Sequence, residues 1–122
     1  MTDRLTTLED LKKMVQAFTK ERDWVKFHSP KTIAQALSVE SSELMELFLW
    51  EDNEDSKLAL EAKRESVENE MADVFWWLLQ LSWQYNIDLT LALENKMELN
   101  KKRYPVEKAK GNTMKYTLLE EH

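Results

Sequence analysis

Four acidic residues of this 122-residue chain lie where a helical protein would ordinarily place apolar side chains. At 100° per residue, Glu40 lies in the middle of the apolar stripe of its helix, and Glu43 lies at the edge of that stripe. Glu70 and Asp73 repeat this arrangement on a second helix. The two stripes consist of Ile33, Ala36, Leu37, Leu44 and Leu47, and of Val74, Trp77 and Leu81. A carboxylate that faces a helical core destabilises the fold unless it is paired or binds a metal ion.

The placement of these acids favours a divalent cation. Neither stripe contains an arginine, so four inward-facing carboxylates would repel one another. Mg²⁺ binds a few carboxylate oxygens together with water and substrate phosphates, and we therefore expect Mg²⁺ at Glu40, Glu43, Glu70 and Asp73. The competing interpretation pairs one or two of these acids with lysine or arginine from elsewhere in the chain. A ferritin-like di-iron site fits less well, because it requires Glu-x-x-His pairs that the sequence lacks.

Hydrogen-bond donors lie on the apolar stripe of a later helix. Lys96, Asn100 and Arg103 share one face with Leu89 and Leu93. Donors on an apolar face opposite a cluster of acids suit a phosphate chain that is bridged to the protein by metal. The spacing fits equally well with Lys96 and Arg103 simply neutralising the acids.

Three of the five tryptophans are candidates for stacking on a base. Trp24 and Trp50 border polar connectors, which favours a pocket over a core position, and Trp77 lies one helical turn beyond Asp73. For Trp76 and Trp83 we expect ordinary core packing.

The elements that must position these side chains are predicted to be helices. One glycine and two prolines argue against β-rich folds and glycine-rich phosphate loops. A Thr6-x-x-Glu9 capping box predicts a helix to about residue 22. Ser29-Pro30 begins a second helix over 31–50, an acidic loop follows at 51–56, and a third helix covers 57–85, with a break near its start left open. Asn86 closes the third helix, Asp88 caps a fourth helix, and Pro105 ends it. We therefore expect a single all-α domain over 1–122, with a loosely structured tail at 106–122.

Composition and charge exclude several classes of function. The net charge of −6 argues against nucleic-acid binding, and the absence of cysteine excludes thiol chemistry and disulfides. Two histidines leave little room for a histidine-rich metal site. The longest uncharged apolar run, 74–87, is too short to span a bilayer, and the N-terminus has no apolar signal-peptide core. We expect a cytoplasmic protein that binds neither membrane nor nucleic acid.

These residues resemble a known family. Glu40-Ser-Ser-Glu43 followed by Glu70-Met-Ala-Asp73 is similar to the ExxE…ExxD signature of the MazG-type, all-α nucleoside triphosphate pyrophosphohydrolases, and most similar to their dCTP pyrophosphatase branch. The segments that carry the likeness are 21–28, 39–50, 70–73, 96–105 and 115–117, which together span almost the whole chain in the expected order.

The resemblance implies a four-helix MazG-like fold and Mg²⁺-dependent hydrolysis of a deoxynucleoside triphosphate to the monophosphate and pyrophosphate. The expected substrate is dCTP or a modified dCTP, in house-cleaning of the nucleotide pool. Glu43 or Glu40 would orient or deprotonate the attacking water while the remaining acids hold metal. The substrate-binding residues that we expect are Trp24, His28, Trp50, Trp77, Lys96, Asn100, Arg103 and Tyr104.

Two departures from a relative concern the base pocket, since Val15 stands in place of histidine and Trp77 in place of tyrosine. A broader (d)NTP pyrophosphatase of the same fold is therefore an alternative, and a non-catalytic helical oligomerisation module is another. The resemblance also implies homodimers that pair into tetramers. The residues agree, because the helix over 71–83 is apolar almost all round and one protomer cannot cover it.

Overall fold

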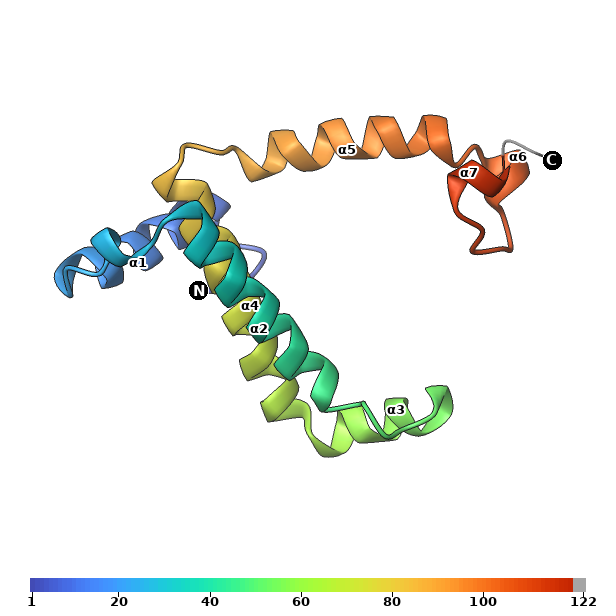
Figure 1. Ribbon diagram of the computed structural model, residues 1–122, viewed down its shortest axis with the longest axis horizontal. Helices are drawn as coiled ribbons and strands as arrows, with labels where there is room; N and C mark the ends of the chain where they lie inside the picture. The colour runs from blue at the N-terminus through green and yellow to red at the C-terminus, as the bar shows by residue number, and fades with distance from the viewer. Residues whose placement is uncertain (120–122) are drawn as a thin grey trace. The chain divides into compact units, whose positions relative to one another are not determined.

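The computed structural model describes residues 1–119, which form helices and no strands, so the all-α prediction is confirmed (Figure 1). These residues belong to two compact units, Met1–Ile87 and a second unit that begins at Asp88. None of the helices within residues 1–119 has the length and hydropathy needed to cross a membrane. The first unit holds α1 (Leu8–Glu21), the 3₁₀ turn η1 (Val25–Phe27), α2 (Pro30–Glu46), α3 (Asn53–Ala62) and α4 (Arg64–Gln84), and the second holds α5 (Leu89–Arg103), α6 (Val106–Ala109) and α7 (Tyr116–Leu119).

Side-chain caps begin most of the longer helices. Ser29 Oγ accepts the Thr32 N–H at 3.1 Å to begin α2, and Asp88 begins α5, both as predicted. The predicted capping box of α1 is wrong by one residue. Thr7 Oγ1 accepts the Asp10 N–H at 3.1 Å, and the Thr7 N–H donates to Asp10 Oδ2 at 3.0 Å. Aspartate therefore takes the part that glutamate plays in the usual motif.

The prediction of a helix over 31–50 is also wrong, whereas the break that the sequence allows near the start of the helix over 57–85 is present at Lys63. The α-helix α2 ends at Glu46, and α3 begins inside the predicted acidic loop, because the Asp52 side chain accepts the Asp55 N–H at 2.7 Å. Lys63 separates α3 from α4, and its Nζ donates to the Leu47 carbonyl at 3.0 Å. The two residues are sixteen positions apart in the sequence, so helical periodicity could not predict this contact. Asn86, with φ of +54°, follows the end of α4 as predicted.

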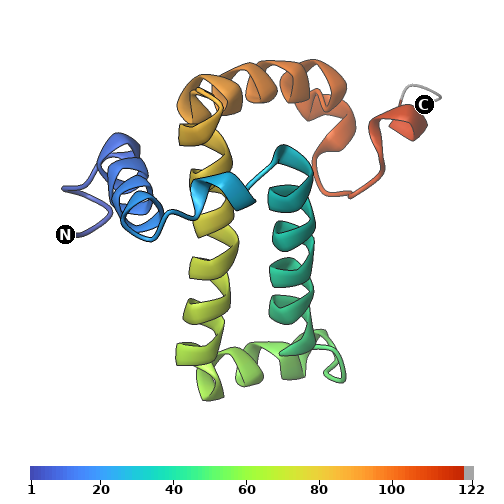
Figure 2. The same cartoon turned by 60° about the vertical axis from the view of Figure 1, so that its left-hand side comes forward.

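In the first unit, α2 and α4 run side by side in opposite directions, and α3 joins their ends (Figures 1 and 2). α1 packs against the C-terminal part of α4, where Thr19 and Gln80 form a buried hydrogen bond. The buried apolar residues of this unit are Val15, Ile33, Ala59, Val67 and Leu79. The pairing of α2 with α4 brings together the two helices that carry the acidic motifs.

In the second unit, the segment after α5 folds back on the end of that helix. The Tyr104 ring packs edge-to-face on Tyr116 with a centroid distance of 6.1 Å, and the Arg103 guanidinium lies 4.4 Å from the centre of the Tyr116 ring. The short helices α6 and α7 thus occupy part of the tail predicted to be loosely structured, and residues 120–122 of that tail lie outside the described residues.

Candidate metal centre

The structure brings the four predicted carboxylates together in the first unit. One oxygen from each of Glu40, Glu43, Glu70 and Asp73 lies within 4.8 Å of the others. Each pair is spaced three residues apart on its helix, so its two carboxylates lie on the same side one turn apart. Because α2 packs against α4, the pair on one helix faces the pair on the other. The first three residues are half-buried and Asp73 is exposed, so the cluster is open to solvent on one side.

The four acids make one another difficult to ionise. The pKa of Glu40 is raised to about 7, chiefly by burial and then by hydrogen bonding to Glu43 and by the negative charge of Glu43. The charges of Asp73 and Glu70 act in the same direction. Burial likewise raises the pKa of Glu70, with contributions from Glu43, Asp73 and Glu46. Like charges in a partly desolvated site disfavour ionisation, as expected.

The surroundings of the cluster fit a hard divalent cation. Oε2 of Glu40 and Oε2 of Glu70 are buried and have no hydrogen-bond partner among the described residues. Within the first unit, no lysine or arginine forms an ion pair with any of the four acids. Unpartnered buried carboxylate oxygens are rare in folded proteins, and oxygen-only ligands are those that Mg²⁺ accepts. The cluster could therefore bind a metal ion.

Glu46 is an acid that the helical-wheel argument did not single out. It lies one turn beyond Glu43 on α2, and its charge contributes to the raised pKa of Glu70. The signal that could have found it is the repeat of the three-residue acid spacing, Glu40, Glu43 and Glu46, along one helix.

The predicted aromatic residues divide between two places in the first unit. His28 is buried, and its ring lies 5.1 Å from Trp77 and 6.2 Å from Trp76, both edge-to-face. Trp24 is partly exposed and packs edge-to-face on Phe18 at 5.7 Å. Phe18 also contacts Trp76, so α1, the connector and α4 share one aromatic cluster. Trp76, for which we expected core packing, belongs to this cluster.

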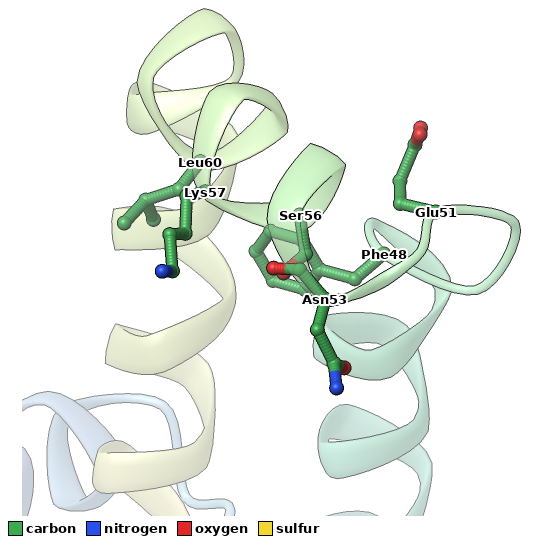
Figure 3. A pocket seen from close by; sticks show the side chains of 6 residues that line it. All are labelled: Phe48, Glu51, Asn53, Ser56, Lys57 and Leu60. Atoms are coloured by element: carbon green, nitrogen blue, oxygen red, sulfur yellow. The ribbon is translucent and has the colours of Figure 1, made fainter.

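Trp50 stands apart from that aromatic cluster. It lies in the turn that follows α2, and 89% of its surface is exposed. A hollow of about 410 Å³ is lined by residues that lie on both sides of Trp50 in the sequence (Figure 3). None of the four acids lines this hollow, and no sequence pattern predicted it. The residues that line it are Phe48, Glu51, Asn53, Ser56, Lys57 and Leu60.

The predicted phosphate- and sugar-binding residues belong to the second unit. Lys96, Asn100 and Arg103 follow one another at four- and three-residue intervals on α5 and share a face of that helix. Tyr104 follows directly after α5 and packs on Tyr116. A role for these residues in binding substrate stays a prediction.

Comparisons with known proteins agree with these observations. A family model described as the MazG-like family matches residues 35–119. Rat dCTP pyrophosphatase 1 is 40% identical over 113 residues, which are 91% of this chain and 66% of the rat protein. The human protein of the same name is 38% identical over 115 residues, 93% of this chain and 68% of its own length. The chain thus spans about two thirds of the length of these curated relatives.

A solved structure also matches. The crystal structure of a pyrophosphatase from Archaeoglobus fulgidus superposes with a TM-score of 0.79 at 34% sequence identity. The match covers 86% of this chain and 98% of the archaeal chain. The likeness therefore extends from the sequence to the fold.

The raised pKa of Glu40 predicts how the stability of the metal-free protein changes with pH. Its carboxyl titrates near pH 7 in the folded state and near the ordinary value of 4.5 in the unfolded state. The folded state thus holds the proton more tightly, and this stabilisation is complete below pH 4.5 and is lost as pH rises through 7. We expect the melting temperature of metal-free protein to fall between pH 5 and pH 8. If the cluster binds Mg²⁺, a hundredfold excess over the Kd adds about 2.7 kcal/mol to the free energy of unfolding, with the larger gain in melting temperature at pH 8.

Matched variants separate the cluster from the rest of the chain. Glu40→Gln removes the titrating group and one ligand, so the melting temperature should vary less with pH and respond less to Mg²⁺. Glu65→Gln removes an exposed acid at the start of α4, outside the cluster, and should behave like wild type. If the melting temperatures of wild type and Glu40→Gln vary with pH in the same way, the cluster does not control the pH dependence of stability.

Proposed function

Because the chain belongs to the MazG-like family, we propose that it hydrolyses a nucleoside triphosphate to the nucleoside monophosphate and pyrophosphate. The observation that carries this proposal is the cluster of four carboxylates, two of which have a buried oxygen without a partner among the described residues. Cleavage of a phosphoanhydride requires charge neutralisation and an aligned water, with little covalent chemistry from the protein. Acids that gather around a cation suit that requirement.

We propose Mg²⁺ as the cation, held by Glu40, Glu43, Glu70 and Asp73. When bound, Mg²⁺ supplies charge neutralisation for the phosphates and lowers the pKa of water. Glu43 is the residue that we assign to orienting and deprotonating the attacking water, with Glu40 as the alternative. One oxygen of Glu43 lies within 4.8 Å of an oxygen of each of the other three acids, so its carboxylate shares the site that they would form around a cation. With a pKa of about 7, Glu40 is partly protonated at neutral pH in the metal-free protein, and a cation bound at the cluster would favour its ionised form.

We propose dCTP or a modified dCTP as the substrate, since the matching mammalian relatives are named dCTP pyrophosphatase 1. Trp24, Trp50, Trp77 and His28 would contact the base. The donors on α5 and the residue after that helix would contact the triphosphate and the sugar. These donors are Lys96, Asn100, Arg103 and Tyr104.

A broader (d)NTP pyrophosphatase is the second candidate, because the surroundings of the predicted base pocket are apolar at two positions. Val15 is buried in α1, and Trp77 packs against His28 and Trp76. Stacking on aromatic rings tolerates every base, so hydrogen bonds or steric limits would have to select cytosine. A non-catalytic module is disfavoured by the absence of ion pairs to the four acids within the first unit.

We also propose that the protein is a homodimer or a tetramer of paired dimers. Leu79 on α4 is buried within the first unit, whereas Met71 and Phe75 on the same helix are 56% and 39% exposed. Met45 on α2 is exposed as well. Exposed apolar side chains of this size on a pair of packed helices are typical of a surface that another subunit covers.

Sedimentation tests the proposed assembly. At micromolar concentration we expect a mass two or four times 14.5 kDa. Met71→Glu places a charge on the exposed face of α4 and should shift the distribution to smaller species. A stable wild-type species of 14.5 kDa would contradict the assembly.

A substrate panel tests the activity. We expect Mg²⁺-dependent release of pyrophosphate, fastest with dCTP or 5-substituted dCTP and slower with dUTP, dATP and ribonucleotides. Glu70→Gln should abolish turnover while retaining the helical circular dichroism signal, since the substitution removes one ligand charge and relieves repulsion. Similar rates for all triphosphates would favour the broader enzyme, and no pyrophosphate release from any of them would contradict the proposal.

Trp50→Ala tests the assignment of Trp50 to the base. Base–aromatic stacking is worth about 1–3 kcal/mol, so we expect KM for the best substrate to rise by about one to two decades. The turnover number should fall less, because loss of uniform binding acts mainly on KM. Leu49→Ala, which truncates the preceding half-exposed apolar side chain, is the matched control and should leave KM near wild type. An unchanged KM in Trp50→Ala would place Trp50 outside the substrate site.

A further inference from the structure

A buried chain of hydrogen bonds crosses from α1 through α4 to the connector between α1 and α2. Thr19 Oγ1 donates to Gln80 Oε1 at 2.9 Å, and Gln80 Nε2 donates to Gln84 Oε1 at 2.8 Å. Gln84 Nε2 then donates to the backbone carbonyl of His28 at 2.6 Å. The Tyr85 hydroxyl donates to the same carbonyl at 3.1 Å. We refer to Thr19, Gln80 and Gln84 as the glutamine relay.

The relay places polar side chains in the core, where apolar side chains are usual. Thr19 and Gln80 are fully buried between α1 and α4, where an apolar pair would pack without giving up hydrogen bonds to water. A buried polar network whose members are satisfied fixes one geometry, because any other arrangement leaves a group unpaired. The amides are also directional. The Thr19 hydroxyl turns the Gln80 oxygen toward α1, so the Gln80 NH₂ group faces Gln84.

The relay ends at a residue that is enclosed by the aromatic cluster. His28 is 8% exposed, and its ring meets the edges of Trp76 and Trp77. Its Nδ1 is buried and has no hydrogen-bond partner among the described residues. Trp77 lies one turn beyond Asp73 on α4. The two donors to the His28 carbonyl therefore fix the imidazole against the helix that carries half of the acidic cluster.

We propose that Gln80 and Gln84 are positioning residues for substrate recognition. Gln84 holds the His28 carbonyl directly and Gln80 orients Gln84, so together they set the place of the imidazole beside the Trp77 edge, where the nucleotide base would bind. This inference rests on the proposed function. Neither glutamine contacts the substrate in this proposal, and both act through His28.

Removing both donors to the His28 carbonyl is the direct test. In Gln84→Met/Tyr85→Phe the carbonyl loses both hydrogen bonds while side-chain volume is nearly kept. We expect KM for the best triphosphate to rise about threefold to tenfold, which corresponds to the net value of one or two hydrogen bonds. The turnover number and the Mg²⁺ requirement should change by less than about twofold, since the four acids are untouched.

Variants at the other end of the relay separate positioning from stability. Thr19→Val leaves Gln80 Oε1 buried without its donor and should lower the melting temperature. Thr19→Val/Gln80→Leu replaces both partners by apolar groups and should recover most of the lost melting temperature, yet its KM should be raised above wild type because Gln84 Oε1 has lost its donor. Ser82→Ala is the matched control. It deletes a buried hydroxyl of α4 that donates only to Leu79 O, and it should leave KM unchanged.

The imidazole resonances of the metal-free, nucleotide-free protein supply a readout independent of activity. The chain has two histidines, so His122→Asn leaves His28 as the one imidazole signal. We expect this signal to move toward its random-coil position in Gln84→Met/Tyr85→Phe and in Thr19→Val/Gln80→Leu, and to stay in place in Ser82→Ala.

Each failure has its own signature. An unmoved His28 resonance in both double variants would overturn the inference even if the wild-type protein is an active pyrophosphohydrolase. A moved resonance with wild-type KM would overturn it too, because His28 would then not matter for the substrate. If the wild-type protein hydrolyses no triphosphate, the proposed function fails, while the resonance still decides whether the relay positions His28.

Discussion

Mutual repulsion among four carboxylates is the constraint on which the rest of this structure depends. Glu40 and Glu70 each have a buried oxygen without a partner among the described residues, and their neighbours in the cluster are also acids. The pairing of α2 with α4 holds these groups together against their repulsion, and the α3 connection closes the pair at one end. A protein that accepts this destabilisation keeps a site that is ready for a cation, because the ligands need little rearrangement when one binds.

The acidic cluster could be predicted from the sequence because its cause is local. Two acids three residues apart on an apolar stripe must lie on one side of a helix, and two such helices bury those sides against each other. The ends of the helices were less predictable. The end of α2 and the break at Lys63 depend on the Asp52 cap and on the contact from Lys63 Nζ to the Leu47 carbonyl. The second of these joins residues that no local pattern relates.

The surroundings of His28 could not be predicted for a similar reason. In the sequence, Gln80 is a single polar residue within an apolar segment, and its hydrogen-bond partner Thr19 is sixty-one residues away. The indole of Trp76 turns toward His28 because α1 and the connector cover that part of α4. Helical periodicity identifies which residues face inward, whereas the identity of their neighbours is decided by tertiary packing.

The short path of the chain between the two acidic motifs has a consequence for folding order. Glu40 and Asp73 are joined by a helical hairpin with brief turns, so loop closure is inexpensive and contact order is low in this part of the chain. During synthesis, α2, α3 and α4 emerge from the ribosome before α5 does. The nascent hairpin can therefore gather its carboxylates while the donors of α5 are still inside the ribosome. Any cation that stabilises this early intermediate must come from the surrounding solution.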